Sequence, residues 1–120
     1  MATREEFINH VNERLTPLFT KDPEKELWVN ERDVQVGAQV VVVNGKRMDQ
    51  PGQTRHITTY VEVYGDGEIK DVNNETTEQF AQVDFYVIEE GQKHYVCPTI
   101  CMYYDEHDLF DHMLNELFGL

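Results

Sequence analysis

The sequence contains no serine, only two cysteines and a single tryptophan among its 120 residues. The absence of serine excludes a seryl nucleophile. Two cysteines, Cys97 and Cys101, are too few for a disulfide scaffold. No apolar run approaches the roughly 20 residues of a membrane-spanning helix, and the acidic N-terminal residues lack the apolar stretch of a signal peptide. These absences predict a cytoplasmic protein that does not bind membranes.

Basic residues are also scarce. Ten Lys and Arg stand against 23 Asp and Glu, and the formal net charge is −13. The imbalance is concentrated in residues 71–120, where Lys93 is the only Lys or Arg beside 11 acidic residues. Such a negative field repels nucleic acid directly and attracts basic protein surfaces. Net charge also serves simply to keep small proteins soluble, so the charge by itself does not name a partner.

Length and composition predict one domain spanning residues 1–120. The chain has a common single-domain length, and its 40% hydrophobic and 11% aromatic content is enough for a core. Helical periodicity predicts a first helix over residues 4–16, with Thr3 and Glu6 as a capping box. A second helix is predicted over residues 106–118, with Asp105 as its N-cap.

Between the helices the apolar period changes to two, which indicates strands. The sequence predicts strands near residues 27–29, 34–43, 55–64, 68–72, 79–89 and 93–104. Asn44-Gly45 and the following residues predict a long hairpin connection or protruding loop over 44–54. Pro98 predicts an edge or bulged final strand, because proline lacks a ladder donor. The predicted fold is α+β: a two-layer sandwich of an antiparallel four- to five-stranded meander sheet with N- and C-terminal helices.

No motif predicts a catalytic site, a metal site or a cofactor. The best metal-ligand set is Cys97, Cys101, His107 and His112, but its spacing matches no common zinc module. A Cys–His pair has no supporting signature. The Gly65-Asp66-Gly67 segment lacks the spacing of a phosphate-binding loop and is predicted to be a hairpin turn. Paired carboxylates are numerous enough to arise by chance.

Two surfaces are candidates for protein binding. The first is the sheet face opposite Val61, Val83 and Phe85, where alternation gathers aromatic side chains. Tyrosine is frequent at interfaces because it offers apolar area with a polar tip. This aromatic sheet face comprises Tyr60, Tyr64, Phe80, Tyr86, Tyr95 and Tyr103. The same positions serve equally as ordinary cross-strand pairs, and a homodimer is one use of such a face.

The second candidate is an array of carboxylates on the last helix and on one turn. Carboxylates held rigidly on helices and strands can stand in for phosphates when a basic partner is bound. An outer helix face of this kind is also commonly just solvated. The predicted partner-binding acidic surface comprises Asp105, Asp108, Asp111, Glu116, Glu89 and Glu90.

These features favour a small acidic, non-enzymatic protein-binding module that self-associates through the aromatic sheet face and presents its acidic surface to a basic partner. Its sharper form is an inhibitor or nucleic-acid mimic that occupies a basic groove. One alternative is a small-ligand-binding or enzymatic domain with a pocket between sheet and helices, near Trp28, His56, Tyr60 and Asp84. Another is a structural subunit of a larger assembly.

Overall fold

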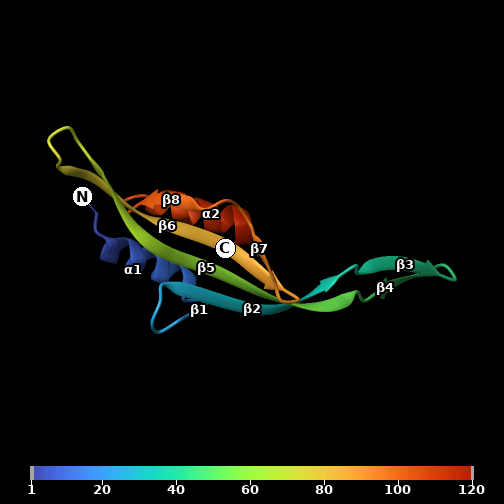
Figure 1. Cartoon of the computed structure of the whole chain (residues 1–120). Helices are drawn as coiled ribbons and strands as arrows, with labels where there is room; N and C mark the ends of the chain where they lie inside the picture. Colours follow the sequence, from blue (N-terminus) through green and yellow to red (C-terminus); the bar gives the residue numbers. More distant parts are fainter. Residues whose placement is uncertain (1, 120) are drawn as a thin grey trace.

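The computed structural model describes residues 2–119, with a helix near each end of the chain and antiparallel strands between them (Figure 1). The helices are α1 (Arg4–Leu15) and α2 (His107–Phe118). The strands are β1 (Thr20–Lys21), β2 (Leu27–Val36), β3 (Gln39–Val43), β4 (Lys46–Gln50), β5 (Gln53–Lys70), β6 (Thr76–Glu89), β7 (Gln92–Tyr95) and β8 (Ile100–Tyr103). The predicted α+β class with terminal helices is therefore confirmed.

The main sheet contains six strands, so the predicted count of four to five is wrong. Its order is β1-β2-β5-β6-β7, and β8 also pairs with β6. One extra strand is β1, a two-residue edge strand of polar residues that apolar alternation along the sequence does not predict. The other arises because the last predicted strand is divided around Pro98: β7 pairs with residues 86–89 of β6, and β8 with residues 80–83. The divided strand lies at the sheet edge, where a missing proline N–H is tolerated.

The predicted strand over residues 34–43 is in fact two strands in different sheets. The chain turns at Gly37, whose φ is +81°, and β3 then pairs only with β4 in a separate two-stranded sheet. The hairpin turn is Asn44-Gly45, with φ values of 51° and 77°. Both central residues of a type I′ turn need positive φ, which explains this residue pair. The predicted 44–54 loop is therefore largely strand.

Residues 37–52 form an arm that projects from the body of the molecule (Figure 1). The arm gives the molecule extents of 78 × 27 × 24 Å and a radius of gyration of 19.5 Å, against about 14 Å for a compact chain of this length. At the base of the arm a Cβ on Gly52 would lie 2.3 Å from the carbonyl oxygen of Val36. Glycine is required there because the two chain segments pass so closely.

Two further local predictions are wrong. The Gly65-Asp66-Gly67 segment is an irregularity inside the continuous strand β5, and the hairpin turn lies at residues 71–75 instead. The N-cap of α2 is Glu106 rather than Asp105, and no side chain caps it. At α1 the Thr3 hydroxyl accepts from the Glu6 N–H as predicted (3.2 Å). The Glu6 carboxylate, however, accepts from the same hydroxyl, which completes only half of a capping box.

Both helices pack against one face of the main sheet. The ring of Phe110 on α2 lies 6.2 Å from Phe7 on α1 and 6.2 Å from Phe85 on β6. Trp28 on β2 is fully buried, and its indole N–H donates to Asn12 of α1 (3.1 Å). The core closes with further side chains from the sheet and helices, among them Val11, Leu15, Val61, Val63, Ala81, Val83, Met102, Tyr104 and Leu114.

Within residues 2–119 no helix is long and apolar enough to cross a membrane.

The Phe110→Ala variant tests the position of the core. Removing a fully buried ring that packs near both α1 and the sheet is expected to lower the free energy of unfolding by about 3–5 kcal/mol. Val72→Ala is the matched control, because Val72 is 100% exposed, and its effect is expected to stay within about 0.5 kcal/mol. Chemical denaturation measures both. Similar losses in the two variants would contradict this core.

Candidate protein-binding face

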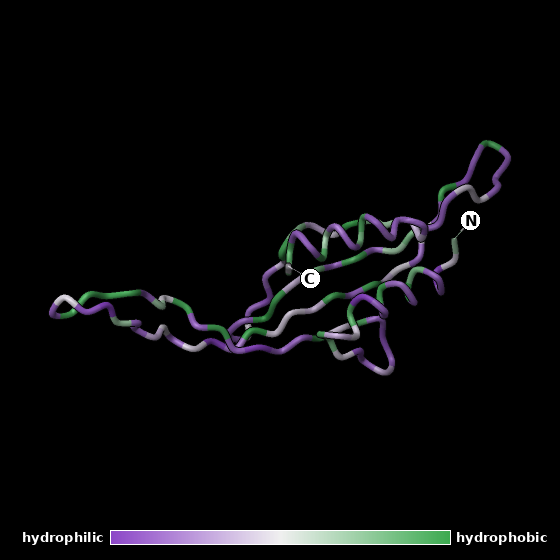
Figure 2. Tube along the Cα trace, turned by 180° about the vertical axis from the view of Figure 1, so that it is seen from behind, coloured by the Kyte–Doolittle hydropathy of each residue, from purple (hydrophilic) through white to green (hydrophobic). Residues whose placement is uncertain are grey.

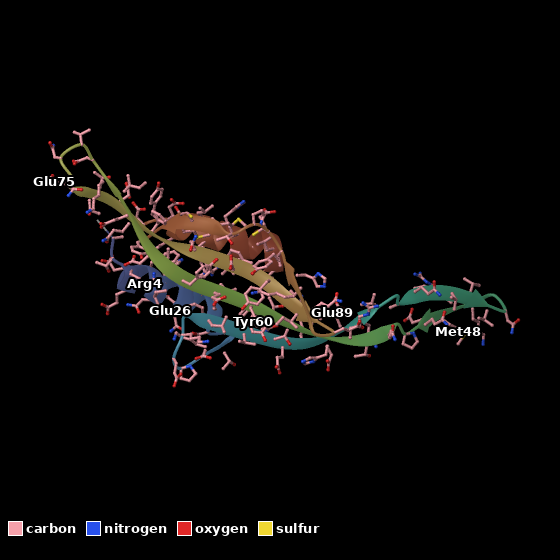
Figure 3. The ribbon with its side chains drawn as sticks, in the orientation of Figure 1. Arg4, Glu26, Met48, Tyr60, Glu75 and Glu89 are labelled. Atoms are coloured by element: carbon pink, nitrogen blue, oxygen red, sulfur yellow. The ribbon has the colours of Figure 1, made fainter. Side chains whose placement is uncertain are left out.

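The sheet face opposite the helices carries aromatic and charged side chains side by side. Strand pairing places Tyr60 opposite Tyr86 and Glu62 opposite Asp84. Because side chains alternate along a strand, these four share the face that points away from Val61 and Phe85. Tyr60 is labelled near the middle of the sheet in Figure 3. We call this surface the open face.

Aromatic rings line the open face in two groups. Tyr60 stacks on Tyr86 with ring centroids 4.9 Å apart, and Tyr95 lies 5.8 Å from Tyr86. Towards the opposite end of the sheet, Phe80 and Tyr103 meet edge to face at 6.1 Å. Tyr64 lies between the two groups, opposite Gln82. All six aromatic residues named from the sequence are thus placed on strands of the main sheet.

Two carboxylates face each other at the centre of the open face. Glu62 and Asp84 are direct cross-strand partners, and like charges in this position normally destabilise a sheet. Each is stabilised by a hydroxyl: Tyr86 donates to Glu62 (3.4 Å) and Thr99 donates to Asp84 (2.5 Å). Asp84 is only 4% exposed. The pair makes the centre of an otherwise aromatic surface strongly negative.

A cation already lies on this surface. The ammonium of Lys93 is 4.0 Å from the ring centroid of Tyr86 and 4.9 Å from that of Tyr95. Aromatic faces attract cations through the negative charge of their π-systems. The pKa of Lys93 is raised by a hydrogen bond with Tyr95, by that residue's charge and by those of Glu62 and Asp84, while desolvation opposes the rise. The open face therefore favours a positive charge between its tyrosines.

The electrostatics of Tyr86 reflect the same environment. Burial raises its pKa to about 12, and the negative charge of Glu62 together with the hydrogen bond to Glu62 adds to the rise. The phenol stays protonated over the physiological range and remains a hydrogen-bond donor to Glu62.

The six acidic residues named from the sequence divide into two kinds. Asp111 is paired within the fold, to His10 (2.8 Å) and Arg14 (3.0 Å) of α1, and Glu89 is paired with Arg55 (2.9 Å). The other four are exposed. Asp108 and Glu116 lie about 80° apart around α2 at 100° per residue. Asp105 lies in the turn before the helix, and Glu90 lies in the β6–β7 turn.

The structure brings no metal-binding group together among residues 2–119. Cys101 is exposed on β8, and Cys97 lies half-buried in the bend between β7 and β8. Burial, and then the charge of Asp84, raises the pKa of the Cys97 thiol. This shift favours the neutral thiol, whereas a nucleophilic cysteine needs the thiolate.

The groups named for a ligand pocket do not converge. Asp84 lies on the open face, Trp28 lies in the core, and His56 is exposed beside Asp33 (3.0 Å). A different cavity of about 180 Å³ is present, lined by Leu18, Phe19, Asn30, Arg32, Thr59 and Phe118. The Thr59 hydroxyl in its wall is buried and has no hydrogen-bond partner.

Sequence reasoning missed three participants in the open face. Glu62 was recoverable, because it alternates with Tyr60 and Tyr64 and therefore shares their face. The place of Lys93 depends on the register set by the Glu90-Gly91 turn. The place of Thr99 was not recoverable, since it depends on where the chain bends around Pro98.

The chain matches no protein-family model, no curated protein matches its sequence, and no solved structure matches its fold. Its functional interpretation therefore depends on its own geometry.

The ionisation of Tyr86 gives a direct test of the open face. Glu62→Gln is expected to lower the pKa of Tyr86, because it removes the charge that opposes phenolate formation. The folded protein holds this proton more tightly than the unfolded chain, whose tyrosine pKa is about 10. The free energy of unfolding is therefore expected to fall as pH rises from about 10 to about 12.

Near-ultraviolet absorbance of tyrosinate measures the titration, and Tyr86→Phe identifies the step that belongs to Tyr86. A titration curve that is the same in wild type and Glu62→Gln would show that the carboxylate and the phenol are not coupled.

Proposed function

We propose that this protein is a non-enzymatic protein-binding module that holds a basic partner surface on its open face. The observation that carries the proposal is the Lys93 ammonium, which lies over Tyr86 and Tyr95 beside Glu62 and Asp84. A site that holds its own cation in this way also suits a lysine or arginine of a partner. Both helices pack on the other face of the main sheet, and Tyr95 on the open face is 54% exposed, which supports access of a partner to this side.

The exposed carboxylates of α2 would extend recognition of a basic partner beyond the open face. Asp108 and Glu116 lie on one side of the helix and Asp105 lies in the turn before it, and none of the three is in an ion pair among the described residues. In its sharper form the module is an inhibitor or nucleic-acid mimic, whose carboxylates occupy a groove made for phosphates. The net charge of −13 supports long-range attraction to such a groove.

An oligolysine peptide at low salt is the probe for this function. We expect it to bind and to shift the ring signals of Tyr60, Tyr86 and Tyr95 in NMR spectra. Lys93→Met is expected to raise the affinity about two- to fivefold, because an exposed cation–π contact of about 0.5–1 kcal/mol no longer competes. Lys70→Met is the matched control, since Lys70 pairs with Glu68 (3.3 Å) away from the open face.

The outcomes separate the two surfaces. Shifts confined to α2 and abolished by Asp105→Asn with Asp108→Asn would assign binding to the acidic helix instead of the open face. Absence of binding at low salt would reject the proposal. An oligoglutamate peptide of equal length controls for non-specific effects, and a pull-down eluted with a salt gradient then identifies the partner.

A small-ligand-binding domain is the second candidate, supported by the cavity with the unpaired Thr59 hydroxyl. The cavity has apolar walls at Phe19 and Phe118 and a guanidinium at Arg32, which suits a small apolar carboxylate. Hexanoate is expected to shift the Thr59 methyl signal if this function holds, and Arg32→Gln is expected to weaken its binding. An unchanged methyl signal at saturating hexanoate would rule out this ligand class.

A further inference from the structure

The arm carries apolar side chains that the protein itself leaves uncovered. Val40, Val42 and Val43 are 48%, 71% and 47% exposed, and Met48 is also exposed. The trace of β3 is hydrophobic over much of its length in Figure 2, while β4 is mostly hydrophilic. An isolated two-stranded hairpin is at best marginally stable in water. The arm therefore has both the surface and the need for a partner.

The valines of β3 occupy both faces of the arm. Val40 and Val42 lie opposite Asp49 and Arg47, whereas Val41 and Val43 lie opposite Met48 and Lys46. An unbroken run of four valines between turns is typical of a strand whose two faces are both covered. In the single chain, β3 is instead an edge strand with one neighbour, β4.

The two edges of the arm differ in a way that selects one for pairing. The outer edge belonging to β4 presents charged and polar residues, Lys46, Arg47, Asp49 and Gln50, which discourage strand addition. The outer edge belonging to β3 presents valines and glutamine, and no described strand pairs with it. An apolar edge with free backbone groups is a template for another strand.

The net charge of the arm, unlike that of the body, does not oppose the approach of a second copy of the chain. Residues 37–52 contain two basic residues and one acidic residue, so the arm is net positive in a chain of net charge −13. Two bodies facing each other would bring both large negative charges together. Arms that overlap antiparallel instead place the two bodies at opposite ends of the pair.

We propose that β3 pairs antiparallel with β3 of a second copy, which forms a four-stranded sheet across a two-fold axis. Each β3 then becomes a central strand, and its valines meet the other copy's valines on both faces. The interface is isologous, because the same segment serves both partners. This pairing is independent of the open face and of any basic partner.

Mass measurement by light scattering tests the pairing. Wild type is expected at twice the 14.1 kDa chain mass, and Val40→Lys with Val42→Lys is expected to give a monomer. Val72→Lys is the matched control, because Val72 is fully exposed at the tip of the other hairpin, and it is expected to remain dimeric. Far-ultraviolet circular dichroism verifies that each variant is folded.

Cysteine scanning tests the pairing mode. Single cysteines are placed at positions 40–43 in a chain carrying Cys97→Ala and Cys101→Ala. Directly opposed residues of an antiparallel pair have Cα atoms about 4.5–5.5 Å apart, within disulfide range. Oxidation is therefore expected to link two chains efficiently near the two-fold axis, while Val72→Cys stays unlinked.

A monomeric wild type, or a dimer that survives the paired lysine substitutions, would overturn the proposal. An arm-dependent dimer without any crosslink at positions 40–43 would overturn the β3–β3 pairing. Oligolysine binding is expected to be the same in the arm variants as in wild type, so failure of this inference and failure of the proposed function are distinguishable.

Discussion

The packing of Phe110 between Phe7 and Phe85 is the contact on which the rest of the structure depends. Its ring joins both helices to the sheet at centroid separations of 6.2 Å. Because α1 and α2 pack against the same face of the sheet, neither helix covers the opposite face. The stacked rings of His10 and His107, 4.2 Å apart, belong to the same helix–helix contact. The sheet face that carries the tyrosines is left without a helix as a consequence of where the aromatic core forms.

An uncovered sheet face does not require opposed carboxylates. Glu62 and Asp84 carry the same charge at directly paired positions, an arrangement that normally lowers stability. The surrounding groups reduce this penalty: hydroxyls of Tyr86 and Thr99 donate to the carboxylates, and the Lys93 ammonium lies nearby. An apolar or amide residue at either position would remove the repulsion entirely. The opposed acids are more easily explained by the proposed binding of a basic partner than by folding, since locally unfavourable groups are typical of functional sites.

Much of the fold was predictable because it follows local periodicity. Phe7, Val11 and Leu15 define α1 at helical spacing, and alternation of Val61, Val63, Val83 and Phe85 defines the core side of β5 and β6. The errors occur where local signals do not determine the outcome. Val34, Val36, Ala38, Val40 and Val42 alternate across Gly37, so the period of two does not show that the chain leaves the sheet there. Whether Gly65–Gly67 forms a turn or an irregularity inside a strand depends on the register with β6.

The candidate site, like the fold, was predictable where it follows from local alternation. Period-two alternation is sufficient to gather Tyr60, Tyr64 and Tyr86 on one face, and the scarcity of basic residues makes Lys93 conspicuous in its half of the chain. That Lys93 lies over Tyr86 depends on the pairing of β6 with β7. Likewise, sequence cannot show that Asp111 and Glu89 are already paired to His10, Arg14 and Arg55, because these contacts join distant segments.

The arm and the open face meet opposite physical demands. Binding a basic partner benefits from a high negative charge, since charge accelerates and directs encounter. The same charge opposes self-association, because two copies repel each other. Placing the apolar, weakly basic segment at the end of a projecting hairpin separates these demands in space, as the 78 Å extent of the molecule allows. A compact protein of this composition would have to bring its like-charged surfaces together in order to pair. The projecting arm therefore makes the proposed self-association compatible with the proposed binding of a basic partner.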